Sequence, residues 1–187
     1  TGLYPYRDFL LAWQNARAHE KSFSIVLMRL ETPHAERTPL VQMKEEQFLQ
    51  VLTGRAETLF GPEASGGRYS MNCLVYYVPG LDQKDCARIV QELLEDDRFD
   101  GLDATVGIAS YPFLESTRSE ILDNARKALD HASMLQGEKI ACFDSVSLNI
   151  SADRLFAQGE IYDAIAEYKK ALTVDEKNFL ARNSLGI

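Results

Sequence analysis

A fifteen-residue segment, GGRYSMNCLVYYVPG at positions 66–80, constrains the fold of this chain more than any other feature. Its first residues predict a short strand, and residues 70–73 predict a tight turn. Residues 74–78 predict a second strand, which Pro79 and Gly80 end. The segment therefore predicts a β-hairpin, and the elements around it must supply the rest of a sheet.

Helical and strand patterns alternate on both sides of the hairpin. Four segments with apolar residues at helical spacing predict helices, and three short apolar runs predict strands. The helices are predicted over 7–19, 41–60, 83–96 and 117–135, and the strands over 22–30, 104–109 and 139–143. Thr117 and Glu120 have capping-box spacing, which predicts that the last of these helices begins at Thr117. The fold class is therefore α/β or α+β, a mixed sheet with helices packed on it.

A different pattern follows Asp144. In LFAQGEIYDAIAEYKKALTVD (155–175), small and apolar residues have the spacing of a helix pair, with Gly159 at the turn. Ala164, Tyr168 and Ala171 are predicted to face inward on the second helix. This order of residues resembles a tetratricopeptide repeat (TPR), a unit of about 34 residues. The resemblance covers one repeat and the start of a second at 179–187.

The sequence therefore predicts two domains, over residues 1–144 and 145–187. TPR units bury a core only by stacking, and about three are usually needed. We therefore expect the natural protein to continue past Ile187.

Composition excludes several classes of function. The formal net charge of −8 argues against a binder of nucleic acid or of an anionic membrane surface, because both need a basic face. No apolar run approaches the roughly 18 residues of a membrane span. The three cysteines form no Cys-x-x-Cys pair, which fits a reducing compartment and gives no zinc site. We therefore expect a cytoplasmic protein.

Residues 1–144 carry several short motifs, in order and correctly spaced, that resemble the GGDEF domains, the bacterial diguanylate cyclases. The motifs are Thr1-Gly2-Leu3 with Arg7 and Phe9, Pro79-Gly80, Val106-Gly107-Ile108-Ala109 with Tyr111-Pro112, and Ala125-Arg126-Lys127-Ala128-Leu129 with Ala132. The resemblance implies a mostly antiparallel central sheet flanked by helices, related to the palm of nucleotide cyclases. Active members bind GTP with two magnesium ions, and two domains meet to form cyclic di-GMP.

The resemblance also implies that the metal ligands are missing. The signature Gly-Gly-Asp/Glu-Glu-Phe is replaced, in order, by Ser70, Met71, Asn72, Cys73 and Leu74. The metal-binding aspartate that ends the first strand corresponds to Arg29, whose charge would repel a divalent cation. Glu31 is the nearby carboxylate, and we expect it to pair with Arg29 or with solvent.

The nucleotide contacts that the resemblance assigns are altered as well. A phosphate-cradling amide is lost at Pro33, and the two guanine-contacting positions are Arg37 and Glu46, of which only Glu46 is a conservative change. The phosphate-binding Lys and Arg positions fall on Ser133 and Gly137. The Arg-x-x-Asp inhibitory site falls on Gly61 and Ala64 and is therefore absent.

Three functions remain open on the sequence. The favoured one is a catalytically inactive GGDEF-like module that binds a protein partner through its TPR, with Tyr162 and Tyr168 as candidate contacts, and needs no metal or cofactor. It would also pair with another GGDEF domain as a homodimer or heterodimer. The alternative is a non-catalytic sensor of GTP or cyclic di-GMP, in which Arg29 and Arg37 hold phosphate beside Glu31 and Glu46. The least favoured is an active cyclase, which would use Mg²⁺ and GTP.

Overall fold

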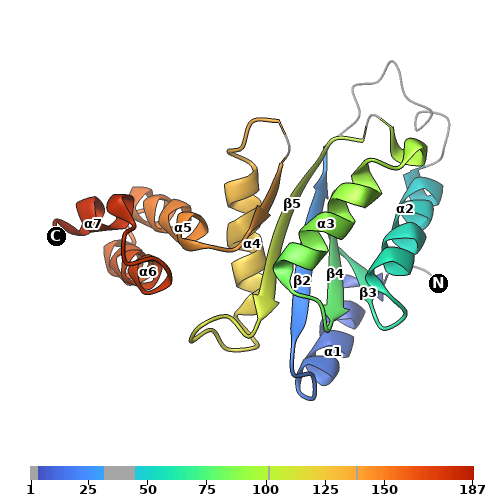
Figure 1. Ribbon diagram of the computed structural model, residues 1–187, viewed down its shortest axis with the longest axis horizontal. Helices are drawn as coiled ribbons and strands as arrows, with labels where there is room; N and C mark the ends of the chain where they lie inside the picture. The colour runs from blue at the N-terminus through green and yellow to red at the C-terminus, as the bar shows by residue number, and fades with distance from the viewer. Residues whose placement is uncertain (1–3, 32–44, 101, 138) are drawn as a thin grey trace.

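One six-stranded sheet forms the centre of the computed structural model, which describes residues 4–31, 45–100, 102–137 and 139–187 (Figure 1). The strand order is β1-β3-β4-β2-β5-β6. The three inner pairings are antiparallel, and the two outer pairings, β1 with β3 and β5 with β6, are parallel. The strands are β1 (Tyr4–Pro5), β2 (Phe23–Leu30), β3 (Ser65–Ser70), β4 (Cys73–Pro79), β5 (Ala104–Tyr111) and β6 (Ile140–Cys142).

Strand β2 lies in the middle of the sheet and is buried on both faces. Successive side chains of a strand point to opposite faces, so Phe23, Ile25 and Leu27 join one apolar cluster, whereas Val26 and Met28 join another. This double burial explains why residues 22–30 are almost continuously apolar in the sequence. The predicted mixed, mostly antiparallel sheet is confirmed.

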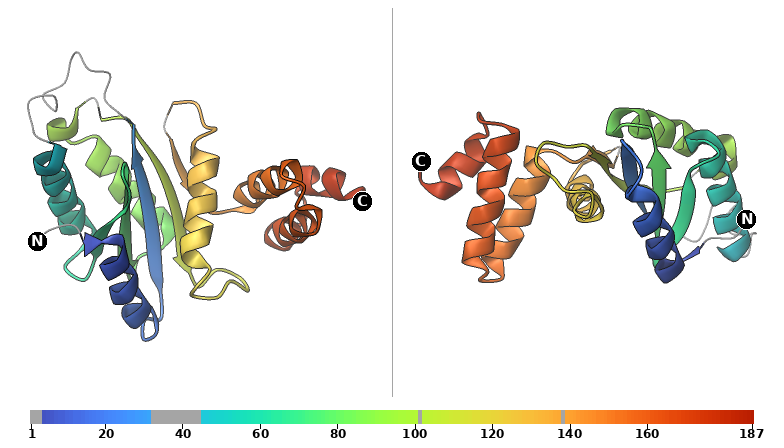
Figure 2. Two further views of the ribbon diagram at one scale, coloured as in Figure 1. Left: turned by 180° about the vertical axis from the view of Figure 1, so that it is seen from behind. Right: turned by 90° about the horizontal axis from the view of Figure 1, so that it is seen from below.

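Two helices cover each face of the sheet (Figure 2). One face carries α1 (Tyr6–Arg17) and α4 (Ile121–Ala132), and the other carries α2 (Glu45–Phe60) and α3 (Gln83–Leu94). A 3₁₀ turn, η2 (Asp97–Phe99), follows α3. Asp82 caps α3 by accepting hydrogen bonds from the backbone amides of Lys84 and Asp85, two and three residues further along the chain.

The predicted start of the last sheet-covering helix was wrong. The Glu120 carboxylate accepts hydrogen bonds from the Thr117 backbone amide at 2.7 Å and from its hydroxyl at 2.8 Å, so the two residues interact as their spacing suggested. However, the Glu120 amide donates to the Thr117 carbonyl at 3.1 Å. This three-residue step forms a tight turn rather than an α-helical one, and α4 therefore begins at Ile121.

Helix α4 packs directly on strand β5 because Gly107 has no side chain. A Cβ atom at Gly107 would lie 2.2 Å from the backbone nitrogen of Leu129 and 2.4 Å from the backbone oxygen of Ala125. Both contacts are with helix backbone, which cannot rotate away as a side chain can. Any larger residue at this position must push α4 off the sheet.

We expect Gly107→Ala to lower the free energy of unfolding by about 1–3 kcal/mol, the usual cost of overpacking. Urea denaturation measures this change. Gly54→Ala is the matched control, because Gly54 lies within α2 and a Cβ there meets no atom within 4 Å. The control should be neutral or stabilising by about 0.5–1 kcal/mol. Equal effects of the two substitutions would contradict this account of the packing.

Three further helices extend the chain beyond the sheet (Figure 1). They are α5 (Ser145–Ala157), α6 (Ile161–Val174) and α7 (Phe179–Leu185). Gly159 lies in the turn between α5 and α6 with a φ of +86°, a conformation that glycine adopts without strain. Ala164, Tyr168 and Ala171 are buried on α6. The predicted helix pair and its inward face are therefore confirmed, while the domain boundary at residue 144 stays a prediction.

The helix pair α5–α6 is joined to α4 by an apolar cluster and a buried ion pair. The cluster runs from the sheet through Ala128 of α4 to Leu148 and Ala152 of α5. The Lys127 ammonium of α4 lies 2.7 Å from the Glu167 carboxylate of α6, and the two side chains are only 8% and 9% exposed. A buried charge needs a partner to remain ionised, so this pair fixes the position of α6 against α4.

Lys127→Ala should lower the free energy of unfolding by about 3–5 kcal/mol, because it leaves the Glu167 carboxylate buried without its closest partner. Replacing both residues together, Lys127→Met with Glu167→Leu, should recover most of that loss. Lys169→Ala, on the exposed face of α6, is the control and should change little. Thermal and urea unfolding measure all three, and a double variant as unstable as the single one would refute this role.

Candidate functional site

The candidate site lies at the end of β2, where three strands bring together positions that the GGDEF resemblance assigns to catalysis. In the register of the sheet, Arg29 is opposite Cys73 of β4 and opposite Thr105 of β5. By the GGDEF resemblance, Arg29 stands at the position of the metal-binding aspartate. Asn72 stands at the position of the hairpin acid that binds metal, and Cys73 at that of its acidic neighbour. The register thus sets a cation beside a thiol at this strand end.

The Arg29 guanidinium is held by two side chains. Its Nε lies 3.4 Å from a Glu31 carboxylate oxygen, and its Nη2 donates to the Ser133 hydroxyl oxygen at 2.7 Å. The Ser133 hydroxyl in turn donates to the Leu129 carbonyl at 2.8 Å. Glu31 also accepts a hydrogen bond from the Thr105 hydroxyl at 3.3 Å. The expected pairing of Glu31 with Arg29 is thus confirmed, and the charge of Arg29 is compensated within the protein.

The tip of the hairpin uses its polar groups locally. The Asn72 carbonyl accepts from the Leu30 amide at 2.8 Å, and the Asn72 side-chain amide donates to the Leu30 carbonyl at 3.4 Å. The Ser70 hydroxyl donates to the Asn72 side-chain oxygen at 3.5 Å. Met71 is 85% exposed at the turn, and Leu74 is buried among the residues beneath α2 and α3. The polar groups of Ser70 and Asn72 are therefore hydrogen-bonded within the hairpin and to the end of β2.

Cys73 is a buried thiol. Burial raises its pKa from the ordinary 9.0 to about 12, although the nearby Arg29 opposes the shift. The thiol therefore stays protonated near neutral pH, and a protonated thiol is neither a good nucleophile nor a metal ligand.

This raised pKa predicts a loss of stability in alkali. A thiol with a higher pKa in the folded state than in the unfolded state stabilises the fold below about pH 9, and the contribution disappears as the pH rises toward 12. Between about pH 8.5 and about pH 10.5, the free energy of unfolding should therefore fall more steeply for the natural chain than for Cys73→Ala. Urea titrations at several pH values measure the two slopes, and parallel slopes would contradict the prediction.

No group of three or more His, Cys, Asp or Glu side chains that could hold a metal ion occurs within the described part of the chain. Arg37 lies outside the described residues, as do Pro33 and the side chain of Glu46. Ser133 is the C-cap of α4, and Gly137 lies in the following loop with a φ of +83°.

The two candidate partner-binding tyrosines differ in accessibility. Tyr162 is 90% exposed near the start of α6. Tyr168 is buried, and its hydroxyl donates to the Asp153 carboxylate of α5. The assignment of Tyr168 as a partner contact was therefore wrong, because its ring packs between the helices of the repeat, as its inward position on α6 requires.

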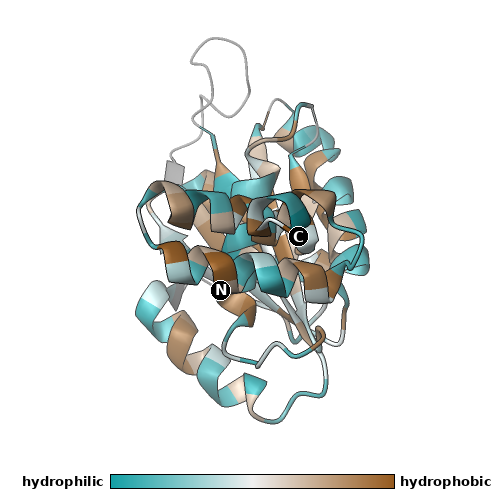
Figure 3. Cartoon of the chain, turned by 90° about the vertical axis from the view of Figure 1, so that its left-hand side faces the viewer, coloured by the Kyte–Doolittle hydropathy of each residue, from teal (hydrophilic) through white to brown (hydrophobic). Residues whose placement is uncertain are grey.

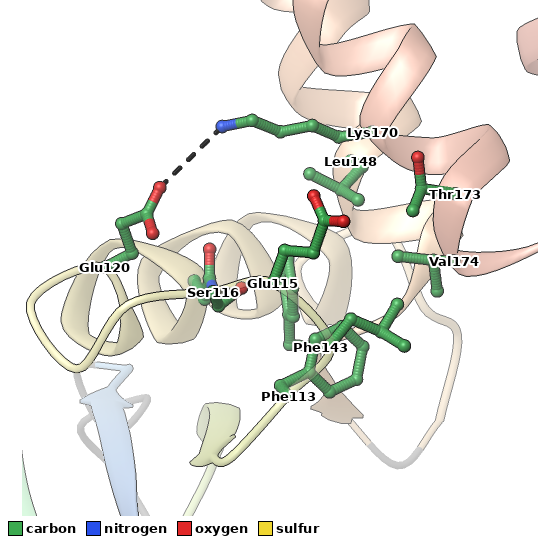
Figure 4. Close-up of a pocket in the computed structure, with 11 residues that line it drawn as sticks. Phe113, Glu115, Ser116, Glu120, Phe143, Leu148, Lys170, Thr173 and Val174 are labelled. Carbon is green, nitrogen blue, oxygen red and sulfur yellow. Dashed lines mark hydrogen bonds and ion pairs between the residues drawn. The ribbon is translucent and has the colours of Figure 1, made fainter.

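The structure also contains a pocket that the sequence did not predict. It lies where the β5–α4 loop meets α5 and α6, and Phe113, Glu115, Leu148 and Lys170 are among its lining residues (Figure 4). These residues come from segments far apart in the sequence and belong to no motif. Only the packing of α6 beside the loop brings them together.

Comparison with solved structures shows that the chain has the GGDEF-domain fold. It matches the GGDEF domain of FimX from Pseudomonas aeruginosa with a TM-score of 0.58 and 18% identity, over 74% of this chain and 93% of that one. It matches the active GGEEF domain of a diguanylate cyclase from Vibrio cholerae with a TM-score of 0.58 and 11% identity, over 76% and 98% of the two chains. The GGDEF domain of DgcB from Caulobacter crescentus, in complex with c-di-GMP, gives a TM-score of 0.58 and 10% identity, over 75% and 91%.

The second resemblance is confirmed by sequence. The family described as "TPR repeat" matches residues 152–187, which include all of α6 and α7. No curated protein matches the chain in sequence. In the part that the structure describes, no helix has both the length and the apolar character to cross a membrane. The chain thus combines a GGDEF-type fold with a TPR.

Proposed function

We propose that this chain is a catalytically inactive GGDEF-like signalling module that contacts a protein partner through its TPR, in bacterial signalling related to cyclic di-GMP. The observation that supports this most directly is the environment of Arg29. Two-metal catalysis needs carboxylates that neutralise the ions, and this position holds a guanidinium already bonded to Glu31 and Ser133.

The sign of the charge at position 29 opposes the binding of a metal ion. An aspartate at this position would attract Mg²⁺, whereas a guanidinium repels it. Cys73, on the opposite strand, stays protonated and adds no compensating charge. Glu31 alone is a single carboxylate and is engaged by Arg29 and Thr105. The described side chains at this strand end therefore do not favour Mg²⁺.

The TPR supplies the proposed partner contacts. TPR helices form surfaces that bind peptides, and Tyr162 is an exposed aromatic residue, the type that often contributes most to such interfaces. Phe156 and Ile161, on either side of the α5–α6 turn, are also exposed. We include pairing with a second GGDEF domain, as a homodimer or heterodimer, in this proposal.

Incubating the pure chain at high concentration with Mg²⁺ and GTP tests the enzymatic part. We expect no cyclic di-GMP by chromatography and no saturable heat with Mg-GTP or cyclic di-GMP by calorimetry. Formation of product would refute catalytic inactivity. Tight binding without turnover would instead support the sensor, which the 31% exposure of the Arg29 side chain allows. Loss of that binding in Arg29→Met would then place the phosphate at Arg29.

Restoring carboxylates tests whether Arg29 and Asn72 occupy the lost metal positions. Arg29→Asp combined with Asn72→Asp puts one acid at the end of β2 and one on the hairpin turn that bonds to Leu30. We expect this variant to bind Mg²⁺ more tightly than the natural chain. Arg29→Met is the matched control, because it removes the cation without adding an acid. Calorimetric titration with Mg²⁺ measures the gain, and equal binding by the control and the double variant would count against the assignment.

A further inference from the structure

The pocket between the β5–α4 loop and helix α6 is a small, partly apolar cavity. Its volume is about 170 Å³, the room of about six water molecules. Its wall comes from five segments: the loop at 113–116, the residues that begin α4, the residue after β6, α5 and the last turns of α6. Figure 4 shows these segments surrounding the cavity from opposite sides.

The floor of this pocket is apolar and rigid. The rings of Phe113 and Phe143 meet edge to face with 5.1 Å between their centroids. Leu148 of α5 and Val174 of α6 complete this part of the wall. Phe143 and Leu148 belong to the central apolar cluster, so the floor is held by the fold itself. Such a surface suits a short apolar stem.

The positive charge at the rim of the pocket is already compensated. The Lys170 ammonium lies 3.9 Å from the Glu120 carboxylate and 3.5 Å from the Glu167 carboxylate. Glu120 also accepts hydrogen bonds from the backbone amide and hydroxyl of Thr117, which lower the pKa of Glu120. Lys170 is therefore shared between two acids. An anionic ligand would have to compete with both of them.

Glu115 is the rim carboxylate that lacks a partner. It is exposed on the β5–α4 loop, and no ion pair or hydrogen bond of its side chain occurs among the described residues. Figure 4 shows its side chain rising from the loop on the side that faces α5 and α6. With Glu115, Glu120 and Lys170 all ionised, the rim carries a net negative charge. The uncompensated part of this charge is at Glu115, next to the apolar floor.

We propose that this pocket binds a small amphipathic cation: an ammonium, amidinium or guanidinium group on an apolar stem about the size of one side chain. The stem lies on Phe113, Phe143 and Val174, and the cation pairs with Glu115. The ligand has two sources with the same chemistry, a free amine or a basic side chain presented by a partner protein. The site is separate from the strand end at Arg29.

Benzamidine is the probe, with benzoate and benzyl alcohol as anionic and neutral counterparts of similar size. Titrations of the whole chain followed by amide NMR shifts should give saturable binding of benzamidine, with shifts confined to residues around the pocket. We expect the other two compounds to bind at least about fivefold more weakly, since an exposed ion pair contributes up to about that factor. Equal binding of all three compounds, or no saturable binding of benzamidine, would overturn the proposal.

Two variants and one control locate the cation and the stem. Glu115→Gln should weaken benzamidine binding about fivefold, and Thr173→Phe, at an exposed position of α6 that lines the pocket, should block it. Glu63→Gln removes an equal charge from an exposed site outside the pocket and should leave binding unchanged. Unaltered binding in Glu115→Gln, measured on a variant whose melting temperature is unchanged, would also overturn the assignment.

A capped dipeptide, acetyl-Phe-Arg-amide, distinguishes the two sources. Tighter binding of the dipeptide than of benzamidine, lost in Glu115→Gln, assigns the pocket to a basic side chain of a partner. Tighter binding of benzamidine assigns it to a free amine.

Discussion

The close approach of helix α4 to strand β5 is the contact on which the rest of the structure depends. It is made at Gly107, where helix backbone occupies the space that a side chain would need. Through this contact α4 closes one face of the sheet, and its opposite side carries α5 and α6. The Lys127–Glu167 ion pair then fixes α6 on α4 at the cost of burying two charges. One helix therefore positions both the strand end at Arg29 and the TPR.

The same helix joins two sites of different chemistry. Its C-cap, Ser133, accepts a hydrogen bond from Arg29 at the end of β2. The turn before its first residue holds Glu120, which pairs with Lys170 at the pocket between the β5–α4 loop and α6. The positive charge at the end of β2 is compensated within the protein, because Arg29 is paired with Glu31. The pocket keeps an unpaired carboxylate beside an apolar floor. Our two proposals therefore assign ligand binding to the pocket rather than to the strand end at Arg29.

Much of the fold could be predicted because its elements are strongly patterned. The apolar run at 22–30 predicted the central strand, and Gly159 predicted the turn between α5 and α6. The start of α4 could not be predicted, since a capping pair forms equally well on the tight turn before the helix. At the end of β2, the pairing of Arg29 with Glu31 followed from their separation by two residues. The bond from Arg29 to Ser133, more than a hundred residues away, required the packing of α4.

The sequence by itself determined which residues stand at the positions that the GGDEF resemblance assigns to metal ligands, because the identity of a residue can be read without coordinates. It also determined the repeat, whose small and apolar residues recur at fixed spacing. Only the tertiary structure decided which side chains are available. Tyr168 is buried and Tyr162 is exposed, although both are tyrosines of one helix. Likewise, the pocket forms only because α6 packs beside the β5–α4 loop. Its lining residues are far apart in the chain, and their spacing does not predict that they meet.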